Sequence, residues 1–440
     1  MARGPCLRFA ARRYRAAMRQ WNTDVPNMME AWFWKQPADV IDAVIARHHA
    51  EAPLDWFEEP DYDDEVVKPG PGYWCVTRHA DIAAVSRNTE VFSSAAGITM
   101  LDAPPEFTEF FSSMIAMDDP RHARLRRLVA KGFTPKMLAD LDGRVQAAAA
   151  EIVDSVCEKG SCDFVTEVAA ALPLKIVCDL MGIPRSEYQG VFEASNVILG
   201  ISDPEYQPED FDFLTALLTA GGQLAELMKE VAQAKRGADG TDLTSVLVNA
   251  ELPDDQLSDA DLASFFVLLV VAGNETTRNA ISWGLSYLTE HPDQRAIWAA
   301  DFEGIAPTAV EEIVRLSSPV GYMRRTVTRD FVFEGREMQE GEKVAMFYVA
   351  ANRDPAVFDD PFKFDVLRDP NPQYGFGGPG PHYCLGAHLA RREMTVMYRE
   401  LFNRLPDIVA VDEPDTLQAA FIHGVKHLDV EFTPTAPLAA

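Results

Sequence analysis

The sequence predicts a mainly α-helical, α+β fold: one large helix-rich domain with a smaller β-rich part. Helical patterns dominate from about Pro120 to Leu316, and one of the helices is unusually long. Strand-like alternation is confined to short segments near the two ends of the chain. No Ser/Gly-rich linker, internal repeat or low-complexity block divides the 440 residues. We therefore expect a single domain over residues 21–440.

The helices have recognisable periodicity and end signals. The Ala-rich stretch 137–156 and the segment 211–234 have helical periodicity. The long helix is expected to begin after Ser258, an N-cap followed by two aspartates in the first turn. It should end at His291-Pro292, because proline cannot continue a helix. At 1.5 Å per residue this helix would span roughly 45–50 Å, enough to cross the domain.

The strand signals are fewer and shorter. A Pro/Asp/Phe-rich loop of little regularity occupies 357–374. Strands are expected at 73–77, 325–333, 343–348, 408–411 and 427–432.

Composition excludes several kinds of partner and location. The formal net charge is −28, which argues against nucleic acid and anionic membranes as partners. The 6 cysteines show no C-x-x-C pair and no zinc-site spacing, as expected in a reducing cytoplasm. No uninterrupted apolar run approaches the roughly 18 residues of a membrane span. We expect a cytoplasmic monomer without a membrane span.

Residues 1–20 differ from the rest because they contain arginines and no acid. They superficially resemble an organellar transit peptide, which is one interpretation. The segment has no apolar core of a secretory signal. We favour a disordered N-terminal tail, or translation that starts upstream of a natural Met18, so that residues 1–17 would not belong to the native protein.

Cys384 follows a turn rich in glycine and proline at 377–381 and precedes a helix-like segment that starts near Ala387. Backbone N–H groups at a helix N-terminus stabilise negative charge, so we expect a thiolate. A shielded thiolate is the axial haem ligand used in oxygen activation. The alternative is a small buried apolar residue. The pattern G-x-G-x-x-G at 375–380 is not a dinucleotide site, because no early strand–turn–helix unit surrounds it.

Polar residues interrupt the long helix at Ala272-Gly273-Asn274-Glu275-Thr276-Thr277. Small residues allow a flat ligand to approach, and Glu275 and Thr276 would supply a proton source and a hydroxyl beside it. The alternative is that these residues mark the exit of the helix to the surface.

Two further groups of charged residues have both a functional and an ordinary interpretation. Glu312 and Arg315 lie three apart on one helix face and suit an ion pair, although such pairs are common on surfaces. The basic face formed by His122, Arg124, Arg126 and Arg127 is either solvated or clamps carboxylates.

The order of these motifs resembles the bacterial cytochrome P-450 family. An A-G-x-E-T-T helix is followed by E-x-x-R, then by an aromatic-D-x-x-R loop (Phe364, Asp365, Arg368), then by G-x-H-x-C-x-G. The resemblance extends from about Tyr73 to the C-terminus. It implies haem b (iron protoporphyrin IX) between the long central helix and the Cys-loop helix, and insertion of one oxygen atom of O2 into an unactivated C–H bond. The sequence has no flavin or iron–sulfur motif, so the resemblance implies a ferredoxin and a ferredoxin reductase as electron donors.

The resemblance also assigns roles to residues. Cys384 would be the iron ligand, Glu275 and Thr276 would deliver protons to dioxygen, and Glu312, Arg315 and Arg368 would form a structural triad that holds the thiolate loop. The other residues expected to bind the haem are His122, Arg126, Ala272, Gly273, Arg325, Phe376, His382 and Gly386.

One departure is visible: the phenylalanine usual in the family seven residues before the cysteine is Gly377 here, and Phe376 precedes it. This displaced G-F-G-G pattern and the run A-G-N-E-T-T-R-N at 272–279 look like a subgroup that hydroxylates sterol side chains, methyl-branched lipids and acyclic terpenoids.

The loop 97–117 is rich in large apolar side chains, which would be costly in water and suit a substrate pocket or lid. Core packing under a long loop is the alternative. The candidate pocket residues are Met100, Leu101, Phe107, Phe110, Phe111, Met114, Val267, Val271, Val320, Tyr322, Phe421 and Ile422.

We expect an apolar steroid or isoprenoid lipid as substrate, since no charged anchor is evident. The alternatives are a hydroxylase of a small monoterpenoid alcohol, or a non-catalytic haem protein that binds a ligand. The Glu275–Thr276 pair argues against the latter, because a ligand-binding protein does not need proton delivery. A basic patch for docking the ferredoxin could be formed by Arg121, Arg124, Arg127, Lys131, Arg391 and Arg392.

Overall fold

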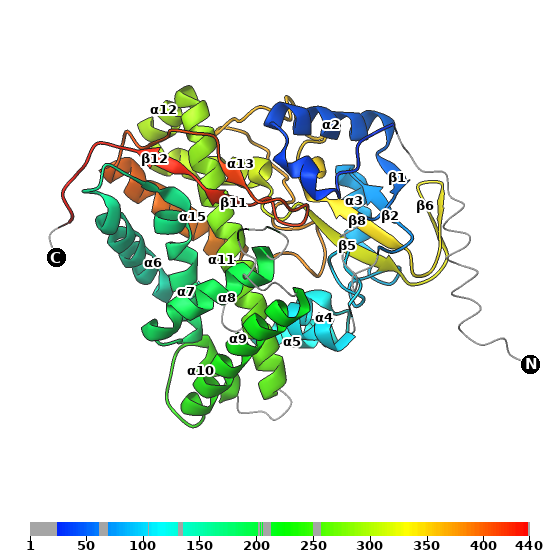
Figure 1. Ribbon diagram of the computed structural model, residues 1–440, viewed down its shortest axis with the longest axis horizontal. Helices are drawn as coiled ribbons and strands as arrows, with labels where there is room; N and C mark the ends of the chain where they lie inside the picture. Colours follow the sequence, from blue (N-terminus) through cyan, green and yellow to red (C-terminus); the bar gives the residue numbers. More distant parts are fainter. Residues whose placement is uncertain are drawn as a thin grey trace, which may run out of the picture.

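The computed structural model describes residues 24–60, 69–103, 105–130, 135–200, 203, 205, 213–249 and 257–438. The Arg-rich segment 1–20 and Lys131 lie outside the described residues, so the boundary at residue 21 stays a prediction. Helices dominate and a small sheet lies at one side (Figure 1), which confirms the predicted mainly α fold of one domain.

The long helix α11 (Asp259–Glu290) runs through the middle of the molecule (Figure 1). Its N-cap is Ser258, whose Oγ accepts a hydrogen bond from the Asp261 backbone N–H at 3.0 Å. The helix ends at His291, before Pro292, as predicted. The helices that pack on it are α4 (Pro105–Ser112), α7 (Ala171–Met181), α8 (Tyr188–Gly200), α9 (Phe213–Lys235), α12 (Pro292–Ala300), α13 (Phe302–Ser317) and α15 (Ala387–Arg404).

By length and composition alone, α11 is long and apolar enough to cross a membrane. No uninterrupted apolar run of α11 is that long, because its apolar residues are interspersed with small and hydroxyl-bearing ones. More than half of the most apolar window of this helix is buried inside the protein. It is the central helix of a packed core.

The remaining helical elements include η2 and η4, which also contact α11, and others that lie farther from it. They are η1 (Ala31–Lys35), α2 (Ala38–Glu51), α3 (His79–Arg87), η2 (Ser113–Ala116), α5 (Arg121–Val129), α6 (Pro135–Val156), η4 (Val165–Ala169), η5 (Arg185–Glu187), α10 (Leu243–Val248) and α14 (Tyr348–Ala351).

The main sheet has five strands in the order β1-β2-β8-β5-β3. Strands β2 and β8 are parallel, with Tyr73 opposite Lys343, and the other neighbours are antiparallel. The predicted strand 325–333 is two strands, because the chain bends at 328–330 and β6 then pairs with β7. The bounds are β1 (Leu54–Phe57), β2 (Tyr73–Val76), β3 (Phe92–Ser93), β5 (Tyr322–Val327), β6 (Phe331–Phe333), β7 (Arg336–Met338) and β8 (Lys343–Phe347).

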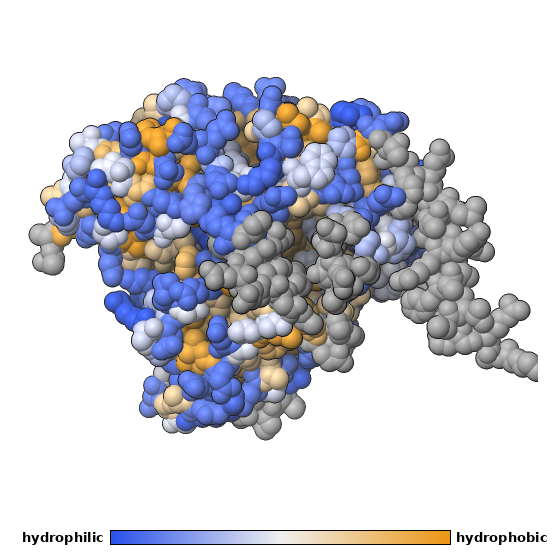
Figure 2. All heavy atoms as spheres, viewed as in Figure 1, coloured by the Kyte–Doolittle hydropathy of each residue, from blue (hydrophilic) through white to orange (hydrophobic). Residues whose placement is uncertain are grey.

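Two small sheets near the C-terminus complete the fold. They contain β4 (Ser161–Asp163), β9 (Val409–Ala410) and β12 (Asp429–Glu431) in one sheet, and β10 (Asp415–Thr416) and β11 (Val425–His427) in the other. Buried apolar residues form one large cluster around α11 and two smaller clusters against the main sheet. The face seen in Figure 2 is largely hydrophilic with scattered apolar patches, as expected of an acidic chain.

Candidate active site

A cavity lies between α11, α15 and β5, with about 1490 Å³ of empty space, part of which opens to solvent. Its walls are mainly apolar, and the polar groups on them are few. The face of α11 that lines it consists of Phe265, Leu268, Leu269, Ala272, Gly273, Thr276, Thr277 and Ala280. These positions follow the three- and four-residue spacing of one helix face.

The structure places Val267 and Val271 outside this cavity. Val267 is fully buried in the core around α11, and Val271 packs against the same core. They lie on other faces of the helix than Leu268 and Leu269, which line the cavity.

Thr276 and Gly273 shape the cavity wall at the middle of α11. Thr276 Oγ1 donates a hydrogen bond to the Ala272 carbonyl oxygen at 2.8 Å, one turn earlier. Such a bond competes with the helix ladder and tends to bend it. A Cβ at Gly273 would lie 2.9 Å from Cγ2 of Val177 on α7, so glycine lets the two helices approach closely. The hydroxyl therefore stays at the wall of the cavity, beside a narrow point of the helix packing.

Glu275 has a different environment from Thr276. Its side chain is 2% exposed, forms an ion pair with Arg278 and does not line the cavity. Burial raises the pKa of Glu275, and the Arg278 guanidinium partly opposes this. Arg278 Nη1 also donates to Asn196 Oδ1 on α8 at 3.2 Å. The acid and the alcohol are neighbours in sequence but lie on different faces of α11.

The loop before Cys384 is tightly packed. Gly377 has φ +90°, a conformation that favours glycine, and a Cβ at Gly380 would lie 2.6 Å from the Ser86 carbonyl oxygen. The Cys384 N–H donates to the Phe376 carbonyl oxygen at 2.9 Å. The Phe376 ring lies under the guanidinium of Arg391, 4.2 Å from ring centroid to Cζ, and lines the cavity. Phe376 thus lies directly beside Cys384 although it is displaced by one position in the sequence.

Cys384 is a free cysteine whose side chain opens into the cavity. Burial raises the pKa of the thiol, although the Gly386 N–H, the guanidinium groups of Arg126 and Arg391, and the Ala387 N–H lower it. Binding to a metal ion removes the proton of a thiol outright.

Four nitrogen-bearing side chains gather on the cavity wall beside Cys384: His122, Arg126, Arg325 and His382. The rings of His122 and His382 lie 4.2 Å apart between centroids. Burial, together with the neighbouring Arg325, His122 and Arg126, lowers the pKa of His382 to about 3. Arg325 Nε and His122 Nε2 are buried and have no hydrogen-bond partner among the described residues. His122 Nδ1 lies 3.3 Å from Asp119 Oδ1, but the unpartnered Arg325 Nε and His122 Nε2 still point to a site for an anion.

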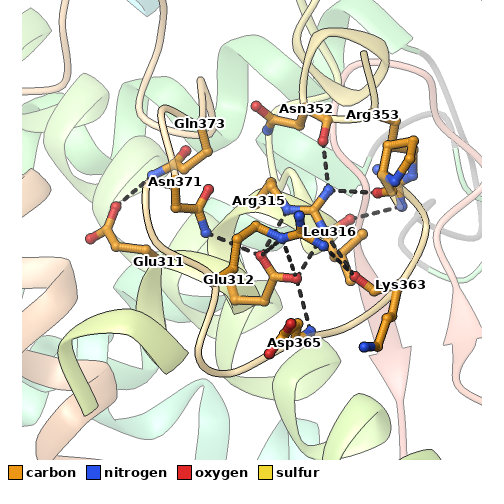
Figure 3. A network of polar contacts seen from close by, with 12 residues as sticks. Glu311, Glu312, Arg315, Leu316, Asn352, Arg353, Lys363, Asp365, Asn371 and Gln373 are labelled. Atoms are coloured by element: carbon orange, nitrogen blue, oxygen red, sulfur yellow. Dashed lines mark hydrogen bonds and ion pairs between the residues drawn. The ribbon is translucent and has the colours of Figure 1, made fainter. Parts of the chain in front are cut away.

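A network of polar contacts holds the loop that leads to Cys384 (Figure 3). Glu312 and Arg315 of α13 are completely buried and paired through two bonds of 2.8 Å. Arg368 Nε lies 3.1 Å from Glu312 Oε2, and the Asp365 N–H donates to Glu312 Oε1 at 3.0 Å. Asn371 Nδ2 donates to the same carboxylate at 3.1 Å. One buried carboxylate therefore collects donors from across 365–371.

Arg315 extends the network to the base of the Cys loop. Its Nη1 donates to the carbonyl oxygens of Asn352 at 2.7 Å and Pro361 at 2.6 Å. The Asn352 side chain in turn accepts a hydrogen bond from the Tyr374 N–H at 2.6 Å. Tyr374 lies two residues before Phe376, so the network fixes the start of the loop that positions Cys384.

Comparisons with known proteins agree with this geometry. The sequence model of the family described as Cytochrome P450 matches residues 212–297 and 305–415. A methyl-branched lipid omega-hydroxylase of Mycobacterium tuberculosis is 46% identical over 404 residues, which cover 91% of this chain and 93% of that protein. The chain belongs to the cytochrome P450 family.

Other relatives of this P450 support the same family assignment. The steroid C26-monooxygenase of Mycobacterium tuberculosis is 35% identical and covers 96% of this chain and 98% of its own. The structure of the Mycobacterium marinum cytochrome P450 CYP268A2 in complex with pseudoionone has a TM-score of 0.88 and 40% identity, over 94% of this chain and 100% of that one. The protein is a haem-thiolate monooxygenase, and a non-catalytic haem protein is set aside.

The residues of this P450 fit haem b, the cofactor of the family. Cys384 would hold the iron, and the orphaned Arg325 Nε and His122 Nε2 would face the two propionates. Ala272 and Gly273 both line the cavity, and their small size would leave room for the flat macrocycle. Haem supplies the oxygen-activating chemistry when bound. The protein supplies an anion site, a thiol and an apolar enclosure.

The candidate substrate residues from 97–117 divide between the cavity and the core. Met114 lines the cavity, whereas Met100 is buried in a core cluster against the sheet, where its N–H donates to Tyr322 Oη at 3.1 Å. Phe110 and Phe111 of α4 pack on α9, where a Cβ at Gly221 would lie 2.8 Å from both rings. Phe107 packs against Phe111 with tilted rings, 4.6 Å between ring centroids, and Leu101 is half-buried. Much of this loop is therefore packing.

The remaining candidates are near β5. Val320 lines the cavity, and Ile422 pairs with it through an isolated β-bridge. Phe421 and Tyr322 pack in the core cluster against the sheet. Ile115 of the loop 97–117 lines the cavity as well, and lining residues that the sequence did not suggest are Val177, Leu180, Phe265, Leu268, Leu269, Met323 and Tyr348. Three of these lie on the cavity face of α11, whereas those on α7, β5 and α14 meet the cavity only through the tertiary fold.

Proposed function

We propose that this P450 hydroxylates a terminal methyl group of a methyl-branched apolar chain, as found in isoprenoid lipids and steroid side chains. The observation that carries the proposal is the lining of the cavity by Phe265, Leu268 and Leu269 of α11 with Met114, Val320 and Met323. The basic groups on the wall are those assigned to the propionates, so none is left to anchor a charged substrate. An apolar enclosure favours a chain that is held by burial of its surface.

The names of the relatives support the position of attack. One relative acts at the omega position of methyl-branched lipids and the other at C26 of steroids. A compact monoterpenoid alcohol is the second candidate by its size, but a mainly apolar wall offers its hydroxyl group only a few polar partners, such as Thr276 and Thr277.

Binding spectra of the ferric protein test the substrate class. We expect a methyl-branched fatty acid ester and a sterol side-chain analogue to shift the Soret band, and geraniol-sized alcohols to shift it weakly. Product analysis should then show a primary alcohol at the branched end. Equal shifts for straight-chain and branched ligands, or a preference for the small alcohols, would contradict the proposal.

A variant that narrows the cavity sharpens this test. Leu269→Trp places bulk into the space that the chain would fill and should exclude about two methylene groups, which costs ~1.6 kcal/mol or roughly tenfold in Kd. Val267→Leu, on the core face of the same helix, is the matched control for folding and should leave the relative order of ligands unchanged.

We infer that Thr276 passes protons to dioxygen at the cavity wall and that Glu275 supplies them through water. The hydroxyl lines the cavity, whereas the acid is turned toward Arg278. Thr276→Ala should therefore keep haem binding and divert most of the reducing equivalents to hydrogen peroxide, because a positioned proton donor contributes about 10²–10⁴-fold. Unchanged coupling of NADH to product, measured with surrogate redox proteins, would show that this hydroxyl carries no protons.

Electron donors are proposed to be a ferredoxin and its reductase, and the protein is proposed to be a cytoplasmic monomer. The basic docking patch is weaker than the sequence suggested, because several of its arginines are paired with acids: Arg121 with Glu109, Arg391 with Glu311, and Arg392 with Asp142 at 2.8 Å. Arg127 is exposed on α5. We expect electron transfer to decline as salt rises, but with a shallow slope.

A further inference from the structure

Met323 on β5 carries a thioether that the chemistry described so far does not use. It lines the cavity and shares one face of the strand with Arg325, because side chains two residues apart on a strand point to the same side. The alternate residues point away from the cavity: Tyr322 packs in the core cluster against the sheet, and Arg324 pairs with Asp102. The sulfur of Met323 therefore belongs to the wall beside the group assigned to the haem propionates.

Met323 is also the most accessible thioether. Among the methionines whose side chains the structure describes, it is the only one that is not buried. Met346 of β8 lies directly opposite it in the sheet and is completely buried. Met114 and Met394 line the cavity too, but they are only 7% and 1% exposed. Because part of the cavity opens to solvent, a small oxidant reaches Met323 first.

The reaction of the family can release an oxidant into this cavity. A monooxygenase that fails to transfer oxygen to its substrate releases hydrogen peroxide, as expected above for Thr276→Ala. Peroxide converts an accessible methionine to its sulfoxide, which is polar. We propose that Met323 is a sulfoxidation site, at which peroxide from uncoupled turnover makes the apolar wall polar and weakens the binding of apolar ligands.

The oxidation needs no reagent other than the peroxide. A lone pair of the Met323 sulfur attacks one peroxide oxygen, so that an S–O bond forms and the O–O bond breaks. The other oxygen leaves as water and takes both protons of the peroxide. The sulfur loses two electrons and the peroxide gains them. A methionine sulfoxide reductase can reverse the step by oxidising a dithiol, so the modification is reversible.

The sulfoxide oxygen explains the expected loss of affinity. It accepts hydrogen bonds, and the basic groups on the wall beside it are those assigned to the propionates. An apolar ligand that covers it would remove it from water without offering a donor, which is unfavourable. The loss of affinity for the natural substrate rests on the apolar substrate proposed above, whereas the oxidation itself does not.

Peptide mass spectrometry of the haem-loaded protein tests the oxidation. After a short exposure to hydrogen peroxide, stopped with catalase, we expect one added oxygen atom at Met323 before any at Met114, Met394 or Met346. Met346 is the matched internal control, because it faces the same side of the sheet but is covered. Oxidation of Met346 as fast as that of Met323 overturns the proposal.

Two ligands of the ferric haem measure the effect on the wall. Clotrimazole binds iron through a nitrogen and has large apolar rings that must fit the cavity, whereas imidazole binds iron without them. Oxidised wild type should bind clotrimazole roughly tenfold more weakly than reduced wild type, with the affinity for imidazole unchanged. Treatment with methionine sulfoxide reductase and dithiothreitol should restore the affinity.

Two variants assign the effect to one side chain. Met323→Leu conserves the volume and cannot be oxidised, so its affinity for clotrimazole should be the same before and after peroxide. Met323→Gln places a polar amide at the same position and should bind clotrimazole like the oxidised wild type.

The outcomes separate this proposal from those made above. If Met323 is oxidised but the ratio of the two affinities is unchanged, the sulfoxide does not control binding and the proposal is overturned. A loss of clotrimazole affinity that persists in Met323→Leu assigns the effect to another site and also overturns it. Because peroxide is added directly and clotrimazole is not the natural substrate, neither result depends on the substrate class or on the role of Thr276.

Discussion

Arg315→Met is expected to lower the free energy of unfolding by about 3–5 kcal/mol, the cost of removing one partner of a buried ion pair, although Arg368 still contacts the Glu312 carboxylate. Both side chains are completely buried, and Arg315 also donates to three backbone carbonyls of the loop that leads to Cys384. The variant should therefore be isolated with little haem even when it is folded. Urea denaturation and the haem-to-protein absorbance ratio measure the two effects.

The matched control is Arg399→Met. Arg399 pairs with Glu303 at 2.7 Å, but Glu303 is 71% exposed. Exposed pairs contribute about 0–1 kcal/mol, so this variant should unfold like wild type and keep its haem. If Arg315→Met lowered the free energy of unfolding and the haem content no more than Arg399→Met does, the role given to the buried network would be contradicted.

Arg325→Leu is expected to weaken haem binding roughly 10- to 100-fold and, at the same time, to stabilise the protein without haem. Its Nε has no partner among the described residues, and burial lowers the pKa of the guanidinium. A hydrogen bond to a charged group contributes about 1.5–3 kcal/mol, which a propionate would supply and leucine cannot. Without the anion, however, an unpaired buried cation destabilises the fold. Haem transfer to apomyoglobin and thermal unfolding of the haem-free protein measure the two opposite changes.

Arg324→Leu is the control for the direction of the change in stability. Arg324 is the preceding residue, is equally buried, and pairs with Asp102 at 2.7 Å. Its removal should destabilise the haem-free protein and leave haem affinity nearly unchanged. If both variants shifted stability in the same direction, the cluster around Arg325 would not be an anion site.

The fold was largely predictable because its strongest signals are local. Ser258 and Pro292 define the ends of α11, and the alternation near 343–348 corresponds to β8. It was harder to predict from the sequence which residues of α11 face the cavity. Its middle is apolar on every side, so periodicity could not distinguish Val267 and Val271, which pack in the core, from Leu268 and Leu269, which line the cavity.

The site was predictable where the motif itself carries the chemistry, as for Cys384 and Glu312. The partner of Glu275 was also visible in principle, since Arg278 lies three residues later on the same helix. Val177, Tyr348 and Glu393 could not be found in this way, because only tertiary packing brings them to the cavity. The raised pKa of the Cys384 thiol likewise depends on burial, which sequence spacing does not report.

The absorption spectrum of the reduced protein with carbon monoxide tests the central claim most directly, namely that Cys384 is the thiolate ligand of haem iron. We expect the wild type to show the long-wavelength Soret band of a thiolate-ligated complex. Cys384→His should still bind haem and should show a band at shorter wavelength. If the wild type lacked the long-wavelength band in an intact, haem-loaded sample, or if Cys384→His retained it, the assignment of Cys384 would be wrong.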